Sequence, residues 1–262
     1  MKQVAVQVFL LLSMLIVGAA IWGMCRLLRC KPVDPGIPDP RKSSFYALAS
    51  VGCSMAVLVL GMLIQRASHV AVTHGATSGD GTPLSMGSKG LISQCVVLVV
   101  YLLPAGLLML KRKEPLRSAG LTMVNLWSSL LIGATLSLLM MSFFPGGLLA
   151  KLRLIDSQHG VALLFFAFVG FGEEFLFRGF LQVRLAAWRG KAQGLVLAST
   201  IMALAHFPAR FLLEGQALSK AVLSSCADVP GSLLFGFIML CTGNILATGI
   251  FHTSANWVET LQ

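Results

Sequence analysis

Residues 171–179 read Phe-Gly-Glu-Glu-Phe-Leu-Phe-Arg-Gly and lie inside an apolar run from Val161 to Val183 that is long enough to cross a bilayer. Two adjacent carboxylates and a guanidinium therefore occur at membrane depth. One ionised side chain at the middle of a transmembrane helix costs roughly 2.5–3.5 kcal/mol, and three facing lipid would cost roughly 7–10 kcal/mol. We therefore expect this group to face protein or a wet cavity, which makes it a candidate functional site.

The composition indicates a membrane protein. Of the 262 residues, 56% are hydrophobic and only 11% are charged, whereas a soluble domain carries about 25% charged residues. The net charge of +10 is spread over short loops without interleaved aromatic residues. This pattern favours contact with anionic lipid headgroups and argues against nucleic-acid binding.

The apolar runs predict an all-α, polytopic membrane helix bundle of about eight transmembrane helices, because each run is close to the 20 residues needed to span. The predicted spans are Val4–Leu28, Phe45–Ile64, Leu91–Leu110, Met123–Phe144, Val161–Val183, Gly194–Leu213, Val229–Thr242 and Asn244–Val258.

The connectors between these runs differ in positive charge. The first, third and fifth hold twelve Lys and Arg residues, and the second, fourth and sixth hold six. The odd connectors are therefore expected in the cytoplasm, with both termini outside. In a bacterium this protein is expected in the cytoplasmic membrane.

The second connector contains His69 and His74, which we interpret as solvated loop residues. None of the six cysteines forms a CxxC pair, so we expect free thiols in packing positions.

A regular α-helix separates the three charged residues by role. Glu174 and Arg178 are four residues apart, so their side chains can pair. Glu173 lies roughly 100° from Glu174 around the axis and is less easily neutralised by the arginine. A buried carboxylate without a strong partner suits a general base or acid.

Other polar residues occur at a similar depth in the last predicted spans. His206 follows Ala205 in an apolar run, while His252 and Asn256 share one face of the final helix. Counted from one membrane face, Glu173, His206 and His252 lie roughly 13–18 Å deep at about 1.5 Å per residue. Three polar residues at one depth on three helices can converge on one cavity, as an active site requires.

Together these positions form a recognisable pattern. Glu173-Glu174-xxx-Arg178, then His206, then His252-xxx-Asn256 resembles the CPBP family of type II CAAX prenyl endopeptidases and bacteriocin-processing proteins. The likeness covers roughly Val161–Trp257. It implies a catalytic membrane domain at residues 161–258, preceded by a four-helix transmembrane region at residues 1–160 with little motif content.

The resemblance implies the following roles. Glu173 matches the catalytic glutamate, which with His206 activates a water for attack on a peptide carbonyl. His252 and Asn256 match the pair that forms the oxyanion hole.

The same resemblance makes Glu174 and Arg178 supporting residues. One departure is Met202, because the family usually has Phe four residues before the second-motif histidine. Methionine keeps an apolar contact there but gives up a rigid ring.

The residue chemistry agrees with peptide hydrolysis, which needs an activated water, a proton donor for the leaving amine and donors for the oxyanion. The chain has no GxSxG motif and no cysteine beside these positions, so a covalent nucleophile is not expected. The resemblance implies a metal-independent mechanism without a cofactor. Glu173, His206 and His252 also form a plausible zinc set, although HExxH is absent.

We therefore predict an intramembrane endopeptidase that acts on a membrane-associated or exported protein or peptide. One alternative is a non-catalytic membrane protein of the same fold, acting in bacteriocin immunity or as a scaffold. Another is a small transporter that uses the carboxylates as a proton relay. The expected partners are a peptide substrate and the lipid bilayer. The sequence indicates neither an oligomeric state nor a particular substrate.

Overall fold

The computed structural model describes residues 2–67, 88–143 and 146–261. Within these ranges the chain forms helices and no strand, so the predicted all-α membrane bundle is confirmed. The elements are α1 (Lys2–Leu27), α2 (Pro40–Ala67), α3 (Ser88–Arg112), the 3₁₀-helix η1 (Leu116–Ala119), α4 (Leu126–Phe143), α5 (Gly147–Arg153), α6 (Ser157–Glu173), the π-helix η2 (Glu174–Gln182), α7 (Val183–Arg189), α8 (Lys191–Ala205), α9 (Phe207–Leu212), α10 (Leu218–Ala227), α11 (Val229–Thr242) and α12 (Ile245–Val258).

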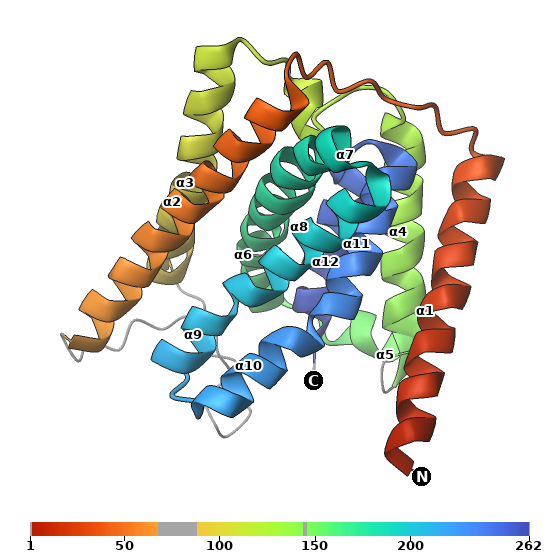
Figure 1. Cartoon of the computed structure of the whole chain (residues 1–262). Helices are drawn as coiled ribbons and strands as arrows, with labels where there is room; N and C mark the ends of the chain where they lie inside the picture. The colour runs from red at the N-terminus through yellow and green to blue at the C-terminus, as the bar shows by residue number, and fades with distance from the viewer. Residues whose placement is uncertain (1, 68–87, 144–145, 262) are drawn as a thin grey trace.

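The chain passes back and forth between two ends of the bundle. In Figure 1 the connectors after α1, α3, α7 and α11 lie at the upper end, and both termini lie toward the lower end. We call the upper end the connector end. This alternation agrees with the predicted order of passes. The placement of the connector end in the cytoplasm stays a prediction from the Lys and Arg distribution.

The predicted number of eight spans is not exact. Among the described residues, six helices are long and apolar enough to cross a membrane: Pro40–Ala67, Gly90–Arg112, Leu126–Phe143, Ser157–Arg189, Lys191–Leu212 and Leu218–Thr242. The last predicted span forms α12, whose 14 residues cover about 21 Å of a hydrocarbon core about 30 Å thick. Helix α12 packs against α4, α6 and α11, so it is a short helix held inside the bundle.

Within the part of α1 whose side chains the structure describes, the first predicted span is represented by a shorter apolar segment, Ser13–Leu27, which is below the length needed to cross a membrane. His69 and His74 lie outside the described residues. All six cysteines are free, as expected. Cys53, Cys95 and Cys226 are exposed on the bundle surface, so the expectation that every thiol packs inside was wrong.

The helix that carries the two glutamates begins earlier than predicted and changes type at Glu174. The Asp156 side chain caps α6 by accepting a hydrogen bond from the backbone N–H of His159 (2.9 Å), which moves the start to Ser157. From Glu174 to Gln182 the chain is a π-helix, whose hydrogen bonds join residues five apart. The assumption of one regular α-helix was therefore wrong. Such π-segments occur frequently at functional sites.

Two glycines allow the backbones around this segment to approach closely. A Cβ atom on Gly170 would lie 2.8 Å from the hydroxyl oxygen and 2.9 Å from the backbone nitrogen of Thr253, so the absence of a side chain at Gly170 lets α6 and α12 approach closely. A Cβ atom on Gly179 would lie 2.1 Å from the carbonyl oxygen of Ala119 in η1. These contacts fix η2 between α12 and the loop before α4.

A buried ionic network joins the N-terminal helices to α7. The carboxylate of Glu114 accepts hydrogen bonds from Arg184 and from Arg112 Nε (2.8 Å). The Ser43 hydroxyl on α2 donates to the same carboxylate (3.2 Å). Arg184 directly follows the predicted span Val161–Val183 and is one of the twelve Lys and Arg residues of the odd connectors. Its side chain is nevertheless fully buried in α7, and it also donates to the carbonyl oxygen of Phe180 (2.8 Å). Burial raises the pKa of Glu114, but the hydrogen bonds from both arginines outweigh it and hold that pKa below its usual 4.5.

Candidate active site

Glu173 and Glu174 occupy the junction where α6 becomes η2. Glu173 is the last residue of α6 and Glu174 is the first of η2. Their exposed fractions are 8% and 0%. Both carboxylates therefore face the protein interior, as the cost of exposing them to lipid requires.

Glu174 forms the expected ion pair with Arg178. The distance from Arg178 Nε to Glu174 Oε2 is 3.6 Å, and both side chains are fully buried. Arg178 Nη2 also donates a hydrogen bond of 2.9 Å to the hydroxyl of Ser232 on α11. The arginine thereby links η2 to α11 and supplies a positive charge beside the glutamates.

His252 lies between the two carboxylates. Its Nδ1 is 3.0 Å from Glu174 Oε1, and its Nε2 is 3.9 Å from Glu173 Oε2. The imidazole stacks on the ring of Phe235, with centroids 4.9 Å apart and an angle of 23° between the planes. The position and orientation of His252 are therefore fixed by Glu174 on one side and an aromatic ring on its face. Sequence reasoning did not anticipate the contact between His252 and Glu174.

His206 approaches Glu173 from a third helix. It ends α8, and its Nδ1 is 3.0 Å from the carbonyl oxygen of Met202. A carbonyl oxygen only accepts, so Nδ1 carries the proton and Nε2 is turned toward Glu173. The distance from His206 Nε2 to Glu173 Oε2 is 3.9 Å. The Met202 position thus holds His206 through its backbone oxygen, which Met supplies as well as Phe.

His206 and His252 both approach Glu173 Oε2. This oxygen is buried and has no hydrogen-bond partner among the described residues. The His206 side chain is 38% exposed, whereas the side chains of Glu173 and His252 are each 10% exposed. His206 therefore forms the most open side of the cluster.

Asn256 is the candidate residue that the structure does not connect to the others. It lies one turn after His252 on α12 and is partly buried. Its side chain forms no hydrogen bond within the described ranges. Its amide is free to bind another group.

The arrangement of Glu173, His206 and His252 also bears on the zinc alternative. In the described parts of the chain, no group of three or more His, Cys, Asp and Glu residues is arranged to hold a metal ion. His252 Nδ1 is engaged by Glu174, and only Nε2 is available toward Glu173.

Residues 156–258 match the protein-family model described as Type II CAAX prenyl endopeptidase Rce1-like. The match covers less than half of the chain and includes every candidate residue named above. No curated protein and no solved structure matches the chain. The matched segment begins at Asp156, which caps α6, and ends at Val258, the last residue of α12. The segment from residue 156 to residue 258 is therefore similar to the Rce1-like type II CAAX prenyl endopeptidases of the CPBP family, the family that its motifs resemble.

Proposed function

We propose that this multi-pass membrane protein is an endopeptidase in which Glu173, together with His206, activates a water that attacks a peptide carbonyl. The family match supports a CAAX-type protease. The single observation that carries the mechanism is the position of Glu173 Oε2, 3.9 Å from the Nε2 atoms of both His206 and His252. Three helices supply these atoms, and a carboxylate between two imidazoles can move protons.

The spacing between Glu173 and His206 suits one water. A distance of 3.9 Å is too long for a direct hydrogen bond, but one water can lie about 2.8 Å from both atoms. In the neutral tautomer that has its proton on Nδ1, which donates to the carbonyl oxygen of Met202, His206 Nε2 has a lone pair. The water can then donate one hydrogen to Glu173 and the other to His206. Its own lone pair stays free to attack the substrate carbon.

His252 is suited to stabilise the oxyanion. With a proton on both ring nitrogens, it donates through Nδ1 to Glu174 and presents Nε2–H toward the reacting carbonyl. In that state two cations, Arg178 and His252, balance the two carboxylates, so the buried cluster is neutral. The amide of Asn256 supplies the second donor from the same face of α12.

The proton then passes to the leaving group. Glu173 takes a proton from the water as the new carbon–oxygen bond forms, and the tetrahedral intermediate carries its negative charge on the former carbonyl oxygen. When the carbon–nitrogen bond breaks, protonated Glu173 returns the proton to the leaving amine. Glu174 and Arg178 act as positioning residues, because each touches His252 or the other and neither touches the water.

The substrate proposal follows the family description. A peptide ending in a prenylated CAAX sequence is the first substrate to test, and the same peptide without the prenyl group is its control. Presentation of the prenyl chain by the bilayer is expected at the connector end, which the charge distribution assigns to the cytoplasm. In a bacterium, the membrane concerned is the cytoplasmic membrane.

The test is cleavage of these two peptides by the detergent-solubilised full chain, with the Glu173→Gln variant beside it. We expect the wild type to cut the prenylated peptide. The variant keeps the size of the side chain and removes its basicity, so its rate is expected to fall at least about a hundredfold. Equal rates for the two proteins would contradict the assigned mechanism. Absence of cleavage of either peptide, or of any membrane or exported protein, would favour the non-catalytic alternative.

A further inference from the structure

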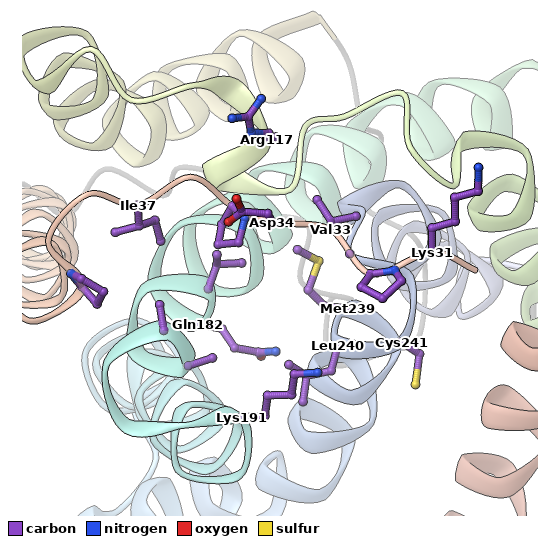
Figure 2. Close-up of a pocket in the computed structure, with 17 residues that line it drawn as sticks. Lys31, Val33, Asp34, Ile37, Arg117, Gln182, Lys191, Met239, Leu240 and Cys241 are labelled. Atoms are coloured by element: carbon purple, nitrogen blue, oxygen red, sulfur yellow. The ribbon is translucent and has the colours of Figure 1, made fainter. Parts of the chain in front are cut away.

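A second site lies at the connector end, apart from the candidate active site. It is a pocket of about 410 Å³ between the α1–α2 connector, η1 and the ends of α7, α8 and α11. Figure 2 shows the connector crossing this pocket through Val33 and Asp34, with Arg117 on one side and Lys191 on the other. None of the candidate catalytic or supporting residues lines it. Its volume is in the range of small-ligand sites.

The connector that walls the pocket is held in place by Asn125, which precedes α4. Asn125 Oδ1 accepts a hydrogen bond from the backbone N–H of Lys31 (2.8 Å). Asn125 Nδ2 donates to the carbonyl oxygens of Lys31 (2.8 Å) and Thr242 (2.7 Å). Val33 packs so closely on Gly243 that a Cβ atom there would lie 2.6 Å from a Val33 methyl carbon. The wall is therefore a built part of the fold.

The rim of the pocket is positively charged. Lys31, Arg117 and Lys191 come from the connector, η1 and the start of α8, and all three side chains are exposed. None of them pairs with a carboxylate in the described part of the chain. The single carboxylate of the pocket, Asp34, accepts a hydrogen bond from the backbone N–H of Gly36 (3.0 Å). Three cations against one carboxylate favour an anionic ligand.

The remaining lining is mostly apolar, and it includes Ile37, Val183, Met239 and Leu240. A site with a cationic rim and an apolar floor matches a ligand with a charged head and a hydrocarbon part. The pocket also lies at the ends of three candidate membrane-spanning segments. Two of these segments end at Arg189 and Thr242, and the third begins at Lys191. Lipid headgroups occupy this level, and basic pockets between helices on the cytoplasmic side bind anionic headgroups.

We propose that this pocket binds the phosphate of an anionic phospholipid. The phosphate lies between Arg117, Lys31 and Lys191, and the adjoining hydrocarbon part of the lipid lies on the apolar floor. Bound lipid also contacts Gln182, the last residue of η2, whose Nε2 donates to the carbonyl oxygen of Gly236 on α11 (2.8 Å). The ligand therefore holds the ends of α7, α8 and α11 together, and binding raises the stability of the folded protein.

The experiment uses the delipidated full chain in an uncharged detergent. Phosphatidylglycerol or phosphatidylcholine is added in mixed micelles, and the unfolding temperature is followed by tryptophan fluorescence. We expect phosphatidylglycerol to raise the unfolding temperature to a plateau and phosphatidylcholine to have no such effect. An equal rise with both lipids would overturn the proposal, because the headgroup charge would then not matter.

Two triple variants separate the pocket from the general charge of this membrane face. Lys31→Gln/Arg117→Gln/Lys191→Gln removes the rim of the pocket. The matched control, Arg41→Gln/Lys111→Gln/Lys113→Gln, removes the same charge from exposed residues at the same end. The half-saturating fraction of phosphatidylglycerol should rise at least about tenfold more in the rim variant than in the control, because charge-assisted contacts are lost only there. Equal losses would show that surface potential alone attracts the lipid.

A third variant keeps the charge and fills the space. Ala187 lines the pocket and is exposed, so Ala187→Phe is expected to abolish the phosphatidylglycerol plateau while leaving the unfolding temperature in phosphatidylcholine unchanged. A retained plateau would contradict the site. Glycerol phosphate and inorganic phosphate test the source of the phosphate. We expect neither to displace the lipid at millimolar concentration, and full displacement would replace the lipid proposal by a site for a soluble phosphate.

Discussion

Replacement of Arg178 by alanine is expected to destabilise the protein strongly. Arg178 and Glu174 are both fully buried, with Nε and Oε2 3.6 Å apart. The substitution leaves Glu174 with His252 as its remaining partner and deprives Ser232 of a hydrogen bond of 2.9 Å. Breaking a buried ion pair by removing one partner costs about 3–5 kcal/mol. This loss is a large share of a total stability of about 5–15 kcal/mol, so little folded protein should accumulate.

The assay is the folded fraction after detergent extraction, measured by size-exclusion chromatography, together with a denaturant titration. Ser232→Ala is the matched control, because it keeps the ion pair and removes only the hydroxyl, which accepts from Arg178 and donates to the carbonyl oxygen of Ser199 (3.0 Å). At about 0.5–1.5 kcal/mol for each of these two hydrogen bonds, it should cost less than Arg178→Ala. The double variant Arg178→Met/Glu174→Gln removes both charges and should recover much of the lost stability. Normal abundance of Arg178→Ala with abolished cleavage would refute the structural role and indicate that Arg178 contacts the substrate.

Three further predictions concern the site and the elements that position it. His252→Ala and Asn256→Ala should each lower the rate constant for cleavage of a saturating substrate about a hundredfold or more per mole of folded protein, as loss of an oxyanion donor does; an unchanged rate would remove that residue from the mechanism. Because the pKa of Glu114 is held below 4.5, its stabilising contribution is full above that pH and is lost as the pH falls through the lowered pKa. Glu114→Gln should therefore destabilise the protein at pH 7 and flatten the acid side of its stability profile, which pH-dependent unfolding measures. Gly179→Ala should abolish accumulation of folded protein, since its Cβ atom would lie 2.1 Å from a backbone oxygen; normal yield would show that η1 moves aside.

The convergence of Glu173 with two histidines could be predicted for two reasons: the free-energy cost of exposing a charge to lipid, and the equal depth of the three residues in the membrane. Charged residues inside an apolar run must face protein, and helix counting placed Glu173, His206 and His252 at one level. The structure places the Nε2 atoms of His206 and His252 each 3.9 Å from Glu173 Oε2. The pairing of Glu174 with Arg178 followed from their spacing of four residues. The role of each residue in catalysis stays a prediction that the experiments above address.

Other features could not be predicted from local pattern. The π-helix of η2 includes Gly179, which packs closely against the backbone of η1, and helical periodicity in the sequence indicates neither feature. The contact between His252 and Glu174 joins residues 78 positions apart. Arg184 follows an apolar run and resembles a connector residue in sequence, and only its distant partner Glu114 explains its burial. The shortness of α12 similarly reflects packing inside the bundle, because apolarity alone does not distinguish a buried helix from a spanning one.

The central claim is that Glu173 activates water as a base, without a metal ion. The most direct measurement is cleavage by the purified full chain after removal of metal with a chelator, with and without added Zn²⁺, beside the Glu173→Gln variant treated in the same way. The account predicts full activity of the metal-free wild type and at least about a hundredfold loss in the variant under both conditions. Activity that disappears with the chelator and returns with Zn²⁺ would contradict the account and make Glu173, His206 and His252 ligands of a catalytic zinc.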